Sequence, residues 1–239
     1  NVRNLHLENI SYASVAQYVG GLVAYFSYTS NPNIIENCTV DKITYTGSTG
    51  ATYFGGIAGF SAAADATISK CSVLRMNVSS QTANVGGIVG ASLANIRECY
   101  TEGSFTISGT GTVGGIVATV GKGFAGSYNP EIHNCFSTVN IKVQAKEITA
   151  GGIIGVVDNI AKNTFKYVLQ TSYFAGSISG SSSSIGMNAT IGSLVGTINS
   201  TNVQITDSFS LATLPSGKSL YNTTKTPKAT KVYDNISTS

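Results

Sequence analysis

The octapeptide VGGIVGAS at residues 85–92 returns along the chain in slightly altered copies. Each copy has a small-residue pair followed by two aliphatic or small apolar residues and a final Gly or Ala. The six copies are GGLVA (20–24), GGIAG (55–59), GGIVG (86–90), GGIVA (114–118), GGIIG (151–155) and GSLVG (192–196). A phrase that recurs at a spacing of tens of residues indicates a repeat protein, in which each repeat is one structural unit.

A second phrase recurs between the glycine phrases, with Ile or Leu three residues before a Cys or Ser. Its copies are IENCTV (35–40), ISKCSV (68–73), IRECYT (96–101), IHNCFS (132–137), LQTSYF (169–174) and ITDSFS (205–210). The steps between successive Cys or Ser positions are 33, 28, 36, 37 and 36 residues. Fixed phrases at variable steps indicate a constant core cross-section with loops of changing length.

Alternating apolar and polar residues follow the Cys position, as in TVDKITYTG (39–47) and SVLRMNVSS (72–80), which is typical of half-buried strands. LHLENISY (5–12) matches this pattern, with Leu5, Leu7 and Ile10 at the places of Cys38, Val40 and Ile43. No segment has a helical period. Repeats made only of strands and turns predict an all-β fold, a right-handed parallel β-solenoid (β-helix) of about six coils. We expect this domain to span residues 1–214, with a polar tail, cap or linker at 215–239.

The glycine phrase predicts a tight corner followed by a core strand. The first glycine is present in all six copies, at Gly20, Gly55, Gly86, Gly114, Gly151 and Gly192, which suggests a positive φ. The second position is Ser193 in one copy, so only small size is needed there. The aliphatic residues behind the corner are expected to stack inside the solenoid; they are Leu22, Ile57, Ile88, Ile116, Ile153 and Leu194.

The alternating glycine and I-x-x-C phrases resemble the GLUG-motif repeats, from about residue 5 to residue 214. That family occurs in bacterial surface and secreted proteins, including putative adhesins and non-catalytic regions of IgA-specific metallopeptidases. The resemblance implies a repeat scaffold and no particular activity. This chain departs from it in its long, uneven insertions, in the two coils without cysteine, and in the tail from Pro215.

All four cysteines occupy one repeat position, at Cys38, Cys71, Cys99 and Cys135. Buried free thiols that act as small apolar residues are favoured. Cys38–Cys71 and Cys99–Cys135 disulfides remain an alternative, because stacked strands lie within the reach of a disulfide. A zinc site is not expected, since the chain has no CxxC motif.

Titratable groups are too few and too dispersed to predict catalysis. The two histidines are His6 and His133, and the nearest approach to a polysaccharide-cleaving face is Glu36, Arg97, Glu98 and His133. We therefore predict no catalytic residue, no metal and no cofactor, and a protein that is not an enzyme.

Only 10% of the residues are charged, which is well below an average domain and favours an extracellular or cell-surface location. Four of the 14 basic residues lie in the tail, against the single acid Asp234, so the body is neutral and nucleic-acid binding is not expected. No apolar run is long enough for a transmembrane helix. The chain begins at Asn1, as expected of a processed chain or an excised piece.

Tyrosines gather in the first quarter of the chain, at Tyr12, Tyr18, Tyr25, Tyr28, Tyr45 and Tyr53. Exposed aromatic residues can bind a protein or a glycan, and these six are the candidate partner-binding residues. The alternative is a structural role at the end of the solenoid. Four aromatics directly after the Cys/Ser position predict a stacked ladder: Tyr100, Phe136, Tyr173 and Phe209.

Three functions remain open at this stage. The first is a non-enzymatic surface scaffold for adhesion, which presents the excursions 44–54, 119–131, 156–167 and 179–190 to a partner. The second is a self-assembling fibre or surface-layer subunit, since open solenoid ends can pair with other copies. The third is a polysaccharide-processing β-helix enzyme.

Overall fold

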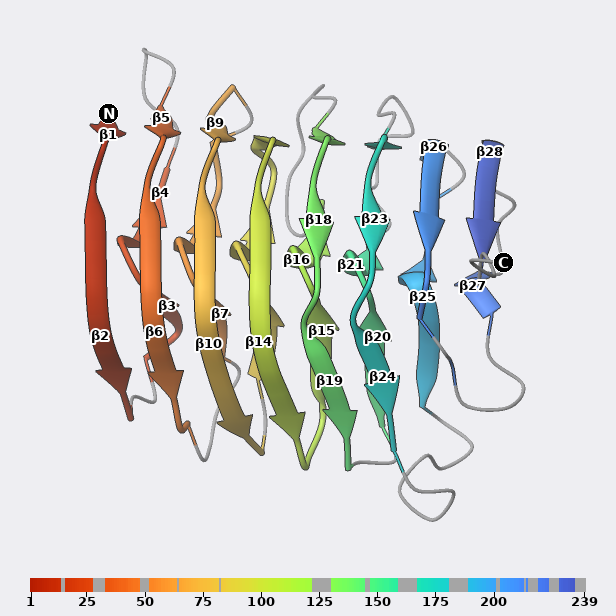
Figure 1. The fold of residues 1–239 in the computed structure, drawn as a ribbon, viewed down its shortest axis with the longest axis horizontal. Helices are drawn as coiled ribbons and strands as arrows, with labels where there is room; N and C mark the ends of the chain where they lie inside the picture. The colour runs from red at the N-terminus through yellow and green to blue at the C-terminus, as the bar shows by residue number, and fades with distance from the viewer. Residues whose placement is uncertain are drawn as a thin grey trace.

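The computed structural model is an all-β solenoid (Figure 1). It describes residues 1–13, 16–27, 33–47, 52–63, 65–81, 83–121, 130–144, 147–158, 167–180, 189–200, 203–212, 214, 219–223 and 228–234. Every regular element in these ranges is a β-strand, and all paired strands are parallel. The predicted fold class is confirmed. Within the same ranges there is no helix that could span a membrane.

The strands fall into successive coils, each of which contains one glycine phrase. The first coil comprises β1 (Val2–Arg3), β2 (His6–Tyr12), β3 (Tyr18–Gly20) and β4 (Val23–Phe26). The second comprises β5 (Ile34–Glu36), β6 (Thr39–Tyr45), β7 (Thr52–Gly55) and β8 (Ala58–Ser61). The third comprises β9 (Thr67–Ser69), β10 (Ser72–Ser80), β11 (Ala83–Gly86) and β12 (Val89–Ser92).

The later coils follow the same order, with some long strands split or fused. The fourth coil comprises β13 (Asn95–Arg97), β14 (Tyr100–Ile107), β15 (Gly111–Gly114) and β16 (Val117–Val120). The fifth comprises β17 (Glu131–His133), β18 (Phe136–Ser137), β19 (Asn140–Val143), β20 (Ile148–Gly151) and β21 (Ile154–Val157). The sixth comprises β22 (Tyr167–Gln170), β23 (Tyr173–Phe174), β24 (Ser177–Ser179) and β25 (Thr190–Ile198). Beyond it lie β26 (Val203–Ser210), β27 (Ser219–Thr223) and β28 (Lys228–Asp234).

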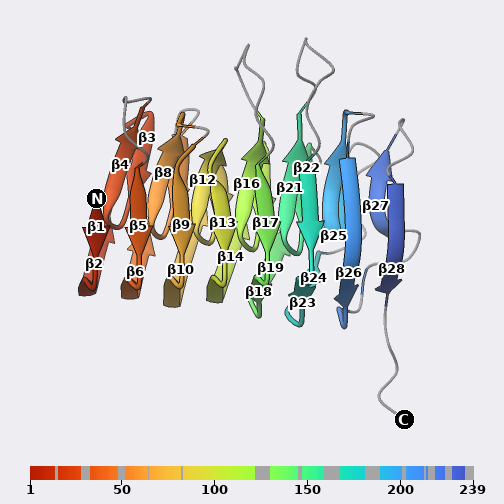
Figure 2. The ribbon, with the colours of Figure 1, turned by 90° about the horizontal axis from the view of Figure 1, so that it is seen from above.

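Two sheets enclose the core. The first, sheet A, has 16 strands and contains the strands on both sides of the Cys/Ser position; the second, sheet B, has 12 strands and contains those on both sides of the glycine pair. Figure 1 shows β2, β6, β10 and β14 of sheet A side by side in front, with β3, β7 and β15 of sheet B behind them. Figure 2 shows the coils following one another from the N-terminus to β28.

The register of the strands places the repeated residues in columns, a column being the same position in successive coils. The first glycines pair in sequence, Gly20 with Gly55, then Gly86, Gly114, Gly151 and Gly192. Leu7 and Ile10 pair with Val40 and Ile43, as predicted. The aliphatic column behind the glycines is fully buried from Ile57 to Leu194. Only Leu22, in the first coil, is partly exposed.

The expectation of a positive φ at the first glycine is wrong. Among the described glycines only Gly103 and Gly121 have positive φ. The glycine pair is needed because of space: a Cβ at Gly86 would lie 1.9 Å from the carbonyl oxygen of Val89, and a Cβ at Gly87 2.0 Å from that of Gly115 in the next coil. The register between β25 and β27 shifts after Gly192, so the next coil does not repeat this corner beside Ser193.

Positive φ occurs instead in the residue just before the Cys/Ser position. This left-handed corner comprises Asn4, Asn37, Lys70, Glu98, Asn134, Thr171 and Asp207, with φ between 46° and 55°. A second such column lies within sheet A at Asn9, Lys42 and Arg75, where a bulge aligns Met76 with Gly103 of the next coil. The sequence analysis did not identify either column.

The segment 215–239 contributes strands to both sheets. β27 pairs with β25 and β28 pairs with β26, all in parallel. Ser208 pairs with Val232, which therefore continues the Cys/Ser column.

Candidate functional site

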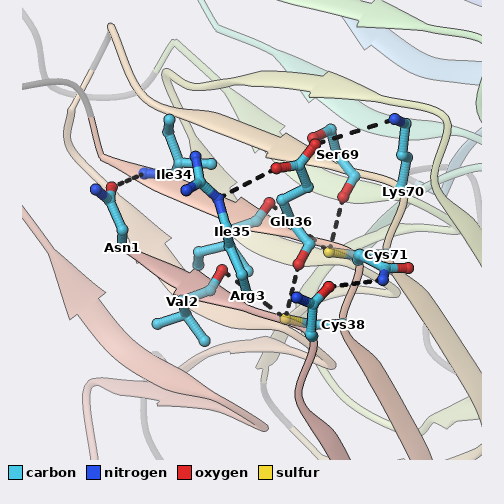
Figure 3. Close-up of polar contacts among 12 residues, drawn as sticks. Asn1, Val2, Arg3, Ile34, Ile35, Glu36, Cys38, Ser69, Lys70 and Cys71 are labelled. Carbon is cyan, nitrogen blue, oxygen red and sulfur yellow. Dashed lines mark hydrogen bonds and ion pairs between the residues drawn. The ribbon is translucent and has the colours of Figure 1, made fainter.

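The cysteine column lies at the left-handed corner of sheet A, and all four cysteines are buried free thiols. Each Sγ lies 3.2–3.4 Å from the carbonyl oxygen of the residue two positions earlier. Each also lies 3.6–3.9 Å from a carbonyl oxygen of the preceding coil. Figure 3 shows this for Cys38, with Glu36 and Val2, and for Cys71, with Ser69 and Ile35.

Serine forms the same hydrogen bond across the corner at the fifth and sixth Cys/Ser positions, Ser172 and Ser208. Ser172 Oγ donates to the carbonyl of Gln170 at 2.9 Å, and Ser208 Oγ donates to that of Thr206 at 2.9 Å. The serine oxygens also accept from the preceding coil, Ser172 from the Cys135 amide and Ser208 from the Ser172 amide. Both side chains contact the carbonyl oxygen two residues earlier, which explains why either cysteine or serine can occupy this position.

The thiols of the column differ in their pKa. Burial raises the pKa of Cys99 well above its ordinary value and raises that of Cys38, whereas a hydrogen bond with Cys99 lowers that of Cys71. A protonated, buried thiol is a poor nucleophile and a poor metal ligand. No cluster of three or more His, Cys, Asp or Glu suited to a metal occurs in the described ranges.

The charged residues on the outer face of sheet A are arranged in pairs across neighbouring coils. Glu36 contacts Arg3 at 3.2 Å and Lys70 at 4.0 Å (Figure 3). Arg97 donates to Glu131 at 2.8 Å. Arg75 forms a two-bond pair with Asp41, at 2.7 and 2.5 Å, which lowers the pKa of Asp41.

The four residues that most resemble the charged face of a polysaccharide-cleaving β-helix do not converge on one point. Glu36, Arg97 and His133 share a column, with Ser69 between Glu36 and Arg97. At about 4.8 Å per strand, Glu36 and His133 lie about 14 Å apart along the sheet. Glu98 lies one residue further on, at the exposed left-handed corner.

The candidate tyrosines divide between the core and the surface. Tyr45 is 1% exposed and stacks on Phe54, with ring centroids 4.5 Å apart, so it is a core residue. Tyr12, one coil earlier, is partly buried, and its hydroxyl donates to the carbonyl of Gly20. Tyr28 lies outside the described residues.

Tyr18, Tyr25 and Tyr53 come together with a fourth ring, Phe60, on the outer side of sheet B. We call these four residues the aromatic shelf. Tyr18 lies 5.1 Å from Tyr25, 5.2 Å from Phe60 and 6.0 Å from Tyr53 between ring centroids. Tyr25 is 46% exposed, whereas Tyr53 is 7% exposed. Phe60 was missed in the sequence, although it follows Gly55 by five residues as Tyr25 follows Gly20.

The aromatic ladder predicted on sheet A is present. Its rings, Tyr100, Phe136, Tyr173 and Phe209, stack at centroid distances of 4.1, 4.9 and 5.2 Å. The backbone of Tyr233 pairs with that of Phe209. Rings that stack on both sides expose only their edges, and this ladder stabilises the coils against one another.

The fold and these columns define a β-solenoid repeat protein. No family model matches the chain, and no curated protein matches it. Membership of the GLUG-motif repeats therefore stays a prediction.

Proposed function

We propose that this chain is a non-enzymatic scaffold of the cell surface or extracellular space, which binds a partner through surface features carried on a constant rod. Loops of variable length at one corner are the observation that carries the proposal. β12 and β13 are joined by two residues, 93–94, whereas β16 and β17 are joined by ten, 121–130. The columns on either side keep their register in both cases. Loops that vary on a rigid framework are the usual place for recognition.

The ion pairs and the low content of charged residues also support the scaffold proposal. Several charged residues of sheet A form ion pairs between neighbouring coils, such as Arg75 with Asp41 and Arg97 with Glu131. The low content of charged residues suits a surface protein, and the resemblance to GLUG-motif repeats agrees with it. Much of each long excursion, namely 48–51, 122–129, 159–166 and 181–188, lies outside the described residues.

A binding screen of the purified chain against glycans and extracellular proteins tests the proposal. Saturable binding to at least one surface, without turnover of the bound glycan, is expected. Turnover that is lost in His133→Ala or Glu98→Gln variants would instead establish the enzyme function. Absence of binding to every glycan and protein tested would count against the scaffold.

A further inference from the structure

Two columns of residues run along sheet B, one on each side of the glycine pairs, and we call the line between them the crease. One wall carries the outward column of β3, β7, β11, β15, β20 and β25; its residues are Tyr18, Tyr53, Asn84, Thr112, Thr149 and Thr190. The other wall carries the matching column Tyr25, Phe60, Ala91, Thr119, Val156 and Thr197. A Cβ at Gly59 would lie 2.6 Å from the Val19 amide nitrogen, so the walls touch at their base.

The crease has no charged residue among these twelve positions, although sheet A carries several ion pairs. Along the crease Tyr53, Ala91 and Thr119 are buried, whereas the other residues beyond the first coil are partly exposed. Tyr25, at 46%, is the most exposed of the twelve residues. The aromatic shelf therefore offers a ligand the most exposed side chain of the crease.

The rings of the aromatic shelf are packed less regularly than those of the aromatic ladder, and one of them, Tyr25, is exposed. Tyr25 stacks on Phe60 with an interplanar angle of 14° and a centroid distance of 5.6 Å. Tyr18 is tilted against both rings, by 38° and 53°. Phe60 is the neighbour of Tyr25 in its column and stacks on its ring, and Tyr25 remains 46% exposed beside it.

We propose that the aromatic shelf binds a single neutral pyranose unit, which packs its C–H face on Tyr25. This inference rests on the proposed scaffold function and names its ligand class. An aromatic face, with its negative π density, attracts the slightly positive C–H groups of a sugar, and the tyrosine hydroxyls add donors and acceptors. Uncharged walls offer no cation for the carboxylate of an acidic sugar. One strongly exposed ring also falls far short of the roughly 800 Å² per partner of a stable protein interface.

The experiment compares two tyrosine variants in binding to polysaccharides. Tyr25→Ala removes the exposed face, and alanine already stands in this column at Ala91. Tyr173→Thr is the matched control, since it removes a ladder tyrosine, and threonine already stands in that column at Thr39. The probes are cellulose, xylan, mannan and chitin, with polygalacturonate as the acidic comparison. Far-UV circular dichroism and thermal unfolding establish that both variants fold.

The expected result is retention of the wild type and of Tyr173→Thr on at least one neutral polysaccharide, with at least tenfold weaker retention of Tyr25→Ala. Tyr25→Phe, which keeps the ring, should retain most of the binding and provides a second test if Tyr25→Ala does not fold. Equal binding of Tyr25→Ala and wild type, or binding only to proteins or polygalacturonate, overturns the pyranose site and leaves the scaffold function standing. Binding to nothing overturns both.

Discussion

A buried hydroxyl or thiol follows six of the seven left-handed corner residues; Leu5 follows the seventh, Asn4. Ser172 is 1% exposed; its Oγ donates to the carbonyl of Gln170 and accepts the amide hydrogen of Cys135 from the preceding coil. An unsatisfied buried amide costs more than an ordinary hydrogen bond contributes. Serine at this position therefore accepts a hydrogen bond from the preceding coil, whereas cysteine contacts that coil only through its weak thiol donor.

Ser172→Ala is expected to lower the free energy of unfolding by about 1–3 kcal/mol, because it leaves the buried Cys135 amide without its acceptor. Ser172→Cys should lose roughly half as much, since Cys135 and Cys99 show that a thiol fits the column. Urea unfolding followed by circular dichroism measures both, with the exposed Ser79→Ala as control. Equal stability of Ser172→Ala and wild type would show that the hydroxyl does not hold the corner.

At the scale of the structural elements, each coil depends on a corner residue with positive φ. Four of the seven corner residues are Asn or Asp, which tolerate this conformation because the short polar side chain can bond locally. Thr171, with φ 46°, is β-branched and is the least suited of the seven.

Thr171→Asn is expected to raise the free energy of unfolding by about 0.5–1 kcal/mol, by relieving part of the left-handed penalty. The reverse exchange in the neighbouring coil, Asn134→Thr, should lower it by a similar amount. Both side chains are exposed, so packing changes little. The two thermal midpoints should move in opposite directions; movement of both in the same direction would contradict the corner argument.

A second element-scale feature is the ion pair that joins β6 and β10. The Arg75 guanidinium lowers the pKa of the Asp41 carboxyl below its ordinary value of 3.8. A carboxyl whose pKa is lower in the folded state stabilises that state above the unfolded pKa, and this contribution disappears as the pH falls through the folded pKa.

Asp41→Asn should therefore destabilise the protein slightly at pH 7, and the difference from wild type should vanish as the pH falls below about 3.8. Urea midpoints at a series of pH values measure it. In an Arg75→Gln background the Asp41→Asn substitution should have little effect at any pH. An effect of unchanged size in that background would show that Arg75 is not the partner responsible.

These elements show what the sequence could and could not predict. The glycine, isoleucine and Cys/Ser columns were predictable, because a residue that fills a fixed place in the cross-section must recur. The left-handed corner was not, since its side chains are exposed and only φ is common to Lys70, Glu98 and Asn134. The burial of Tyr45 was predictable in hindsight, because it lies two residues after the buried Ile43 on the same strand. The aromatic shelf needed the three-dimensional arrangement of sheet B, in which the rings of Tyr18 and Tyr25 lie 5.1 Å apart although they come from different strands.

At the scale of the whole molecule, each coil packs only against its two neighbours, so stability is close to a sum of coil and interface contributions. Ile116, in the fourth coil, is fully buried, with Ile88 and Ile153 on either side in its column. Leu22 has only Ile57 beside it in the described chain and is partly exposed. Truncation to alanine should therefore destabilise the protein more at Ile116 than at Leu22.

Ile116→Ala is expected to cost about 2–5 kcal/mol, as for a large-to-small change in a core, and to speed amide exchange in coils on both sides of the fourth. Leu22→Ala should cost less and speed exchange mainly in the first two coils, because their opening leaves the other interfaces intact. Hydrogen–deuterium exchange resolved by peptide measures the extent of both effects. Uniform acceleration along the whole chain in Leu22→Ala would mean that the rod unfolds as one cooperative unit, and the nearest-neighbour description would then be wrong.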